Sequence, residues 1–351
     1  MRSTIVDGKS MRMGYTTGTC AVAATQAAIT SLESGETVDL VRVQVPAGDV
    51  LAIETREISR THERATYSVI KDSGDDPDIT DGMELQVTVE KTEDGKITWR
   101  KGMGVGVFTE DSLFGTAGEL AINPVPKKEI KKILEEHKGE GIAIEINIPE
   151  GEALAKKTFN PRLGIVGGLS ILGTSGLVRP MSKDAYVATI NMELESLKHL
   201  GVKSIVLTPG HYGENYAKKH YENDRVVQVS NYFGDALCLA RDKGFQKIIV
   251  LGHIGKMAKL AIGIFQTHSA VADGRMESLA YYLFKMNAPR EFIESVEKEV
   301  TAERALIRCR EEGYGDILEV MERGIEERVK RYLKREDMDI HGKIYTMEDL
   351  S

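Results

Sequence analysis

The chain has 351 residues, of which 41% are hydrophobic and 28% charged, a globular composition with enough apolar material for two cores. Its formal net charge of −8 argues against nucleic acid or an anionic membrane surface as the main partner. The three cysteines form no Cys-x-x-Cys pair, so we expect no disulfide framework, no structural zinc and a cytoplasmic location. The sequence shows no signal peptide and no apolar run long enough to cross a membrane.

Residues 1–150 are predicted to form an α+β domain with β-hairpins. Alternating apolar residues predict one hairpin over 38–54 and a second over 84–100. A helix rich in Lys and Glu is expected over 127–137. The two prolines in front of it interrupt regular structure and prepare the start of the helix.

A Gly/Thr turn over 14–20 opens a helix of small residues, and Thr17 or Thr19 can cap it. The free N–H groups of the first helical turn would form an anion site. The alternative is a capped helix whose alanines allow close packing. The acidic stretch 72–81 lacks the glycine and terminal Glu of a calcium loop, which favours a solvated turn.

Residues 151–336 are predicted to form an α/β domain, a Rossmann-like parallel sheet with helices on both faces, because short apolar strands alternate with helices. Residues 337–351 are expected to be a mobile or docking tail. The glycine-rich stretch 158–182 is interpreted as the entry strand of this domain followed by a binding loop. A glycine-kinked core strand and its turn is the alternative.

Polar and glycine residues follow the predicted strands where each one ends. In parallel sheets ligands bind beyond these carboxyl ends, so the residues predict a binding rim. The strand-end segments are Thr208–Gly210, Ser230–Asn231, Gly252–Lys256 and, after the next helix, Thr267–Ser269.

Several segments in the same order resemble the CbiD family of cobalt-precorrin-5B C-1-methyltransferases. They are Gly-Tyr-Thr-Thr-Gly-Thr-Cys at 14–20, Ala-Ile-Asn-Pro-Val-Pro at 121–126, Lys-Lys-Thr-Phe-Asn-Pro-Arg-Leu-Gly-Ile at 156–165, Gly-Gly-Leu-Ser-Ile-Leu-Gly-Thr-Ser-Gly at 167–176, Gly-His-Ile-Gly-Lys at 252–256 and Thr-His-Ser at 267–269. The resemblance implies transfer of a methyl group from S-adenosylmethionine (SAM) to C-1 of a cobalt-corrinoid, giving cobalt-precorrin-6A in anaerobic cobalamin biosynthesis. It also implies one α+β and one α/β domain, and cobalt that arrives only with the substrate, so no protein metal site is expected.

The resemblance assigns no individual catalytic residue, so the roles are our hypotheses. The residues expected to hold SAM are Gly164, Gly167, Gly168, Thr208, Gly210, Gly252 and Gly255. The residues expected to hold the corrinoid and its carboxylates are Thr16, Thr17, Gly18, Arg162, Thr174, Ser175, Lys256 and Arg275, with Arg179 and Lys183 as further cations.

His253 and His268 are the candidate catalytic residues, because a neutral-range pKa suits a proton transfer during methylation. Either could instead lie near cobalt as an axial ligand, or be a hydrogen-bonded loop histidine.

The main alternative function is a non-catalytic corrinoid carrier or scaffold, which would bind the macrocycle but not SAM. A kinase or dehydrogenase is disfavoured because the chain lacks a P-loop motif and a well-placed Gly-x-Gly-x-x-Gly. The sequence leaves a homo-oligomer open.

Overall fold

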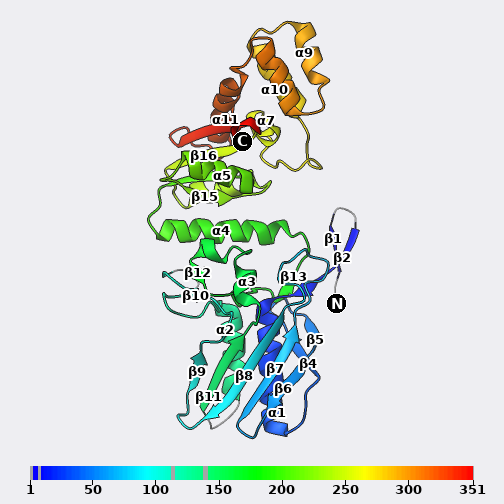
Figure 1. Ribbon diagram of the computed structural model, residues 1–351, viewed down its shortest axis with the longest axis vertical. Helices are drawn as coiled ribbons and strands as arrows, with labels where there is room; N and C mark the ends of the chain where they lie inside the picture. The colour runs from blue at the N-terminus through cyan, green and yellow to red at the C-terminus, as the bar shows by residue number, and fades with distance from the viewer. Residues whose placement is uncertain (1–2, 7–8, 112–114, 137–140, 351) are drawn as a thin grey trace. The chain divides into compact units, whose positions relative to one another are not determined.

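The computed structural model describes residues 3–6, 9–111, 115–136 and 141–350 (Figure 1). The chain forms two compact units, Met1–Lys183 and Asp184–Ser351. The division therefore follows residue 183, whereas the sequence suggested a boundary after residue 150.

A five-stranded sheet in the order β6-β7-β8-β11-β9 forms the centre of the first unit. Its strands are β6 Arg56–Arg60, β7 Arg64–Ile70, β8 Glu84–Thr92, β11 Gly141–Asn147 and β9 Ile97–Arg100. The predicted pairing of a hairpin over 84–100 is wrong, because β11 lies between β8 and β9. It pairs antiparallel with β8 and parallel with β9.

Helix α1, Thr17–Ser34, packs on β7 and β8 and also contacts α2, Pro124–Glu136 (Figure 1). Most of α1 is buried, and its small side chains allow the helix to lie close to the sheet. Gly35, with φ 70°, ends the helix in the left-handed conformation and donates its N–H to the Ser31 carbonyl. Helix α2 starts three residues earlier than predicted, since proline fits the first helical position.

Four short antiparallel pairs complete this unit, and they include the predicted hairpin over 38–54. The pairs are β1 Ser3–Val6 with β2 Lys9–Arg12, β3 Gly14–Tyr15 with β13 Leu177–Val178, β4 Leu40–Gln44 with β5 Val50–Glu54, and β10 Val107–Phe108 with β12 Ile165–Val166. The short helices are α3 Gly151–Ala155 and the 3₁₀ helix η1 Asn160–Leu163.

The glycine-rich stretch 158–182 is not the entry strand of the α/β domain. It forms η1, β12, β13 and connecting loops, and both strands pair with strands of the first unit. These backbone hydrogen bonds explain why the first unit extends to residue 183.

The second unit contains a four-stranded parallel sheet in the order β15-β14-β16-β17, which confirms the predicted parallel sheet. Its strands are β14 Ser204–Thr208, β15 Arg225–Gln228, β16 Lys247–His253 and β17 Asp339–Tyr345. The last strand lies in the stretch interpreted as a tail. Ile340 and Ile344 are four residues apart, which is two repeats of the strand pleat, so their side chains lie on the same face of the sheet. Both are buried in the core of this unit.

Helices pack on both faces of this sheet. The helices of this part of the chain are α4 Lys183–His199, α5 His211–His220, α6 Phe233–Asp242, α7 Ile254–Ala261, α8 Arg275–Lys285, α9 Arg290–Glu297, α10 Ala302–Glu311 and α11 Ile317–Leu333; a 3₁₀ turn, η2 Glu348–Leu350, follows β17. Of these, α8, α9 and α10 pack on other helices. Ile205 and Leu207 enter a large core with α4, α6, α7 and α11. Val206 between them enters a small core with α5 and Tyr345.

No helix in the described part of the chain combines the length and apolarity needed to cross a membrane.

Candidate functional site

The N-terminus of α1 is held by the loop 170–176. Thr16 is the N-cap residue, and its hydroxyl accepts the Thr19 N–H at 3.2 Å. The Gly18 N–H donates to the Leu172 carbonyl at 2.9 Å, and the Thr16 N–H to the Gly176 carbonyl at 3.2 Å. These donors, which the sequence suggested for an anion, therefore bind carbonyl groups of the chain itself.

Thr17 links the same two segments. Its hydroxyl lies 3.1 Å and 3.2 Å from the carbonyl oxygens of Ser170 and Leu172, and it accepts the Leu172 N–H at 2.9 Å. Thr174 is exposed on this loop, and the Ser175 hydroxyl accepts the Leu177 N–H at 3.3 Å. The structure thus brings Thr16, Thr17, Gly18, Thr174 and Ser175 together.

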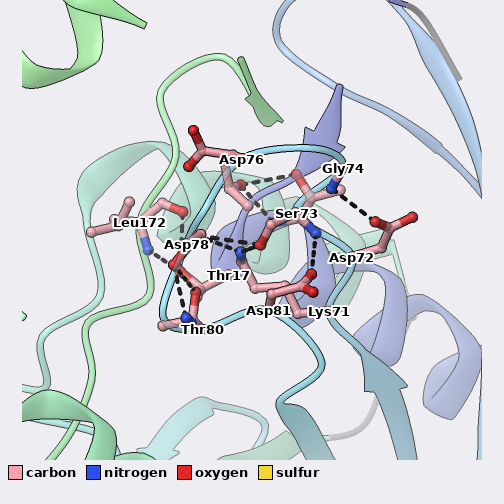
Figure 2. A network of polar contacts seen from close by, with 12 residues as sticks. Thr17, Lys71, Asp72, Ser73, Gly74, Asp76, Asp78, Thr80, Asp81 and Leu172 are labelled. Atoms are coloured by element: carbon pink, nitrogen blue, oxygen red, sulfur yellow. Dashed lines mark hydrogen bonds and ion pairs between the residues drawn. The ribbon is translucent and has the colours of Figure 1, made fainter. Parts of the chain in front are cut away.

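The acidic stretch 72–81 folds around the buried ammonium of Lys71, beside Thr17 and Leu172 (Figure 2). Lys71 Nζ lies 2.7 Å from Asp78 Oδ2 and also contacts the Ser73 hydroxyl. Asp81 accepts the Ser73 N–H at 2.8 Å. The stretch is therefore a turn-rich loop, as expected, with Asp75 and Asp81 exposed to solvent, and the buried ammonium of Lys71 organises its inner side.

Two further carboxylates tie this loop to neighbouring segments. Arg12 contacts Asp72, and Asp76 accepts the Met181 N–H at 2.8 Å. Burial raises the pKa of Asp78, but the Lys71 ammonium and the Thr80 N–H and hydroxyl lower it more, so that the net pKa lies below its ordinary value. Asp78 is thus held as an anion.

Asn160 and Gly168 explain much of the glycine-rich stretch. The Asn160 side chain is buried, donates to the Gly168 carbonyl at 3.0 Å and accepts the Ser170 hydroxyl at 3.1 Å. A Cβ at Gly168 would lie 2.1 Å from the Gly104 carbonyl oxygen. Packing of backbone on backbone therefore requires this glycine, and a bulky residue here would disturb the fold whether or not a ligand binds.

Other predicted residues of this stretch differ in accessibility. Gly164 ends η1 with φ 66°, and its carbonyl accepts the Thr109 N–H at 2.8 Å. Gly167 is exposed, and no atom lies within 4 Å of a Cβ built on it. The half-buried Arg162 places its guanidinium 5.7 Å from the centre of the Phe159 ring.

In the second unit, Thr208–Gly210 and Gly252–Gly255 lie at the carboxyl ends of the adjacent strands β14 and β16. The strand order reverses direction between these two strands, and ligands of open α/β sheets bind at such a point.

Gly210 is the N-cap residue of α5. As a glycine it provides no side-chain cap, and no atom lies within 4 Å of a Cβ built on it. The Thr208 hydroxyl is buried, without a hydrogen-bond partner among the described residues. A Cβ at Gly252 would lie 2.7 Å from Met257 Sδ, so this glycine serves packing.

His253 caps α7. Its Nδ1 accepts the Gly255 N–H at 3.2 Å, so the ring proton is on Nε2, which donates to Glu303 Oε1 at 3.0 Å. Glu303 Oε1 also accepts the Met347 N–H at 2.7 Å. Burial raises the pKa of Glu303, but the Met347 N–H and His253 lower it to a net value below normal. Both ring nitrogens of His253 are therefore engaged.

The buried Lys259 fixes the loop that carries His268. Its Nζ donates to the carbonyls of Thr267 at 3.1 Å and Ala272 at 2.8 Å. The Thr267 hydroxyl donates to Asn231 Oδ1 at 3.1 Å, which joins two of the predicted strand-end segments. His268 is exposed; its Nδ1 accepts the Ala270 N–H at 3.1 Å, and Nε2 has no partner among the described residues.

Of the other predicted cations, Lys256 lies on α7, Arg275 at the start of α8, Lys183 at the start of α4 and Arg179 directly after β13. Arg275 forms a bidentate pair with Asp273, with distances of 2.6 Å and 2.9 Å. Lys256 is half-buried, and desolvation together with the neighbouring Lys259 lowers its pKa. An anion bound beside Lys256 would offset both effects.

The SAM residues proposed from sequence fall into separate units. Gly164, Gly167 and Gly168 belong to the first, and Thr208, Gly210, Gly252 and Gly255 to the second. Within the described residues, no group of three or more His, Cys, Asp or Glu side chains is arranged to hold a metal ion.

Four residues that organise these sites were not predicted from the sequence: Lys71, Asn160, Lys259 and Glu303. Asn160 lies within the motif at 156–165, but nothing in that motif predicts that its side-chain amide is buried and hydrogen-bonded. The partners of Lys259 lie 8 and 13 residues away and that of Glu303 lies 50 away, so no local pattern marks them.

Known proteins are similar to this one over almost the whole length of the chain. Residues 4–180 match the family model described as CbiD, and residues 266–349 match the model described as CbiD, C-terminal domain. A protein of Alkaliphilus oremlandii named cobalt-precorrin-5B C(1)-methyltransferase is 45% identical over 346 residues, covering 98% of this chain and 97% of its own. One of Treponema denticola with the same name is 44% identical over 351 residues, covering 97% and 96%. A crystal structure of a cobalamin biosynthesis protein (cbiD) from Archaeoglobus fulgidus is 30% identical over 80% of this chain and 86% of its own, with a TM-score of 0.41.

Proposed function

The chain belongs to the CbiD family, and on that premise we propose that it transfers a methyl group to C-1 of cobalt-precorrin-5B, giving cobalt-precorrin-6A in cobalamin biosynthesis. The observation that carries the proposal is identity of 44–45% over nearly full length to relatives that bear this name.

We propose SAM as the methyl donor and the switch point between β14 and β16 as its place in a Rossmann-like sheet. Three observations support this placement: open space at Gly210, a helix N-terminus there without a side-chain cap, and the strand order. Backbone N–H groups at the start of α5 would bind the carboxylate of SAM. Gly255, by contrast, already donates its N–H to His253.

Bound SAM supplies an activated methyl group, which leaves its sulfur as the new carbon–carbon bond forms. The protein then has to orient donor and acceptor, and well-oriented pairs reach effective molarities of roughly 10⁵–10⁸ M. The Lys256 ammonium is suited to the acetate and propionate groups of the corrinoid. Arg275 would bind a corrinoid carboxylate either while it keeps its ion pair with Asp273 or after that carboxylate has replaced Asp273.

For proton transfer, the geometry supports His268 more than His253. His268 has an exposed ring nitrogen, whereas His253 uses one nitrogen to cap α7 and the other to hold Glu303. We propose His268 as the proton-transfer residue and His253 as a residue that positions the end of β16.

The test is calorimetric titration with SAM and S-adenosylhomocysteine, in the wild type and in Gly210→Val. Gly210 has φ −179°, an extended conformation that any residue adopts, so valine fills the proposed site without backbone strain. We expect at least tenfold weaker SAM binding, because the side chain blocks the approach to the α5 N-terminus. Gly315→Val is the control, since its Cβ would meet only ordinary contacts, 3.5 Å or more from Arg310.

Two results would contradict these proposals. Unchanged SAM binding by Gly210→Val would place SAM elsewhere. Absence of SAM binding by the wild type, with or without corrinoid, would favour the carrier function.

A further inference from the structure

The second unit contains a groove of about 570 Å³ between α5 and the residues after β17. Its apolar lining comes from Tyr212 and Tyr216 of α5 and from Met347 and Leu350. The polar lining comes from Asn215, Lys218 and Lys219 of the same helix. The volume suits part of a large ligand or the whole of a small one.

The aromatic wall of the groove is firmly packed. Tyr216 stacks on His220, with ring centres 4.2 Å apart, and on Tyr345, at 5.3 Å. Tyr212 is 62% exposed and Met347 47% exposed, so apolar surface remains open to a ligand. A flat apolar body would cover it.

Two lysines of α5 bring positive charge to one side of the groove. Lys218 lies 3.0 Å from Glu214, and the exposed Lys219 has no ion pair among the described residues. Of the nearby carboxylates, Glu348 pairs with Arg310 at 2.6 Å, and Asp349 accepts the Thr346 N–H at 2.8 Å and keeps its negative charge. Lys219 is thus the lysine of the lining that has no ion pair among the described residues, and its ammonium can bind an anionic group of a ligand.

We propose that this groove binds a carboxylated edge of the corrinoid substrate, an inference that rests on the proposed function. The corrinoid combines a flat apolar ring with acetate and propionate groups, which match the tyrosines and lysines respectively. SAM fits less well, because its sulfonium is repelled by the lysines.

The groove also adjoins the proposed methyl-transfer site. Tyr212 follows Gly210 by two residues at the start of α5. On the other side, Met347 donates its N–H to Glu303, which holds His253 at the end of β16. A corrinoid edge in the groove would direct the ring toward the carboxyl ends of β14 and β16.

The experiment compares two probes in the full-length protein. Dicyanocobyrinic acid carries free carboxylates, and dicyanocobinamide has amides on nearly the same ring. For Lys218→Gln/Lys219→Gln we expect about tenfold weaker binding of the acid and less than twofold change for the cobinamide. Lys298→Gln/Lys334→Gln removes two exposed lysines elsewhere in the unit and should change neither. Tyr212→Ala should weaken both probes, since it removes ring contact without removing charge.

Wild-type-like binding of the acid by the Lys218/Lys219 variant would overturn the proposal. So would loss of S-adenosylhomocysteine binding in that variant without loss of the acid, which would assign the groove to the methyl donor. If the wild type binds S-adenosylhomocysteine but not the acid, the groove proposal fails and the methyltransferase proposal stands. If the wild type binds neither, both fail.

Discussion

At the scale of single residues, Lys71 is the side chain on which the first unit's most polar loop depends. Its ammonium is buried, with 2% of the side chain exposed, and Asp78 lies 2.7 Å away. A buried charge is stable only when it is paired and hydrogen-bonded, which explains why Asp78 of the loop 72–81 lies against Lys71. The same loop lies beside the residues that hold the start of α1 (Figure 2).

Replacing Asp78 by Asn should destabilise the first unit by about 3 kcal/mol near pH 7, because it leaves the Lys71 ammonium buried without its counter-charge. The pKa of Asp78 is lowered in the folded state, so its contribution is present above the ordinary pKa of 3.8 and is lost as pH falls through the lowered value. Urea unfolding from pH 7 to pH 2 measures both effects.

The difference in stability between wild type and Asp78→Asn should shrink toward low pH. Asp39→Asn is the control, since this exposed carboxylate makes no side-chain pair among the described residues. A difference that stays constant with pH would show that the ion pair is not its cause.

At the scale of elements, the ends of helices and strands are where these sites are built. The N-terminus of α1 is occupied by the loop 170–176, α7 begins at a histidine cap, and α5 begins at an open glycine. A helix N-terminus binds anions only when its N–H groups are unpaired, so α5 is better suited to a carboxylate than α1.

His253→Asn should retain the cap of α7, whereas His253→Ala should lose about 1 kcal/mol of stability, because Asn is a good N-cap and Ala is not. If His253 only positions this strand end, His253→Asn keeps most of kcat and the same pH profile. Steady-state methyl transfer across pH 5–9 checks this. A lost acidic limb in His253→Asn, with stability retained, would instead support proton transfer by His253.

At the scale of the whole molecule, each unit has its own core, and the C-terminal strand belongs to the second. Four buried residues of this segment, Met338, Ile340, Ile344 and Tyr345, are each at most 6% exposed. Their burial contributes roughly 6–12 kcal/mol, which is comparable to the stability of an entire domain.

Removal of residues 337–351 should therefore unfold the second unit and leave the first intact. Hydrogen exchange should show nearly complete loss of amide protection in β14 and β16, with β7 and β8 unchanged. Removal of residues 1–10 is the control and should leave β14 and β16 protected. Preserved protection of β16 in the C-terminal truncation would show that β17 is dispensable.

The sequence by itself determined the family, through motifs that span residues 14–269, and the alternation of strands and helices in the second unit. It also contains glycines at 102, 104 and 106, and in the structure a Cβ at Gly102 would lie 1.9 Å from the Ile146 carbonyl oxygen. These features can be predicted because hydrophobic periodicity, helix caps and turns depend on residues that are close together in the sequence.

Only the tertiary structure decided which distant segments complete each site. It assigned 158–182 to the first unit, inserted β11 between β8 and β9, and made β17 the edge of the parallel sheet. It also paired Lys71 with Asp78 and His253 with Glu303. Strand pairing and buried ion pairs depend on which surfaces remain to be covered once the chain has folded back, and no local sequence pattern specifies that.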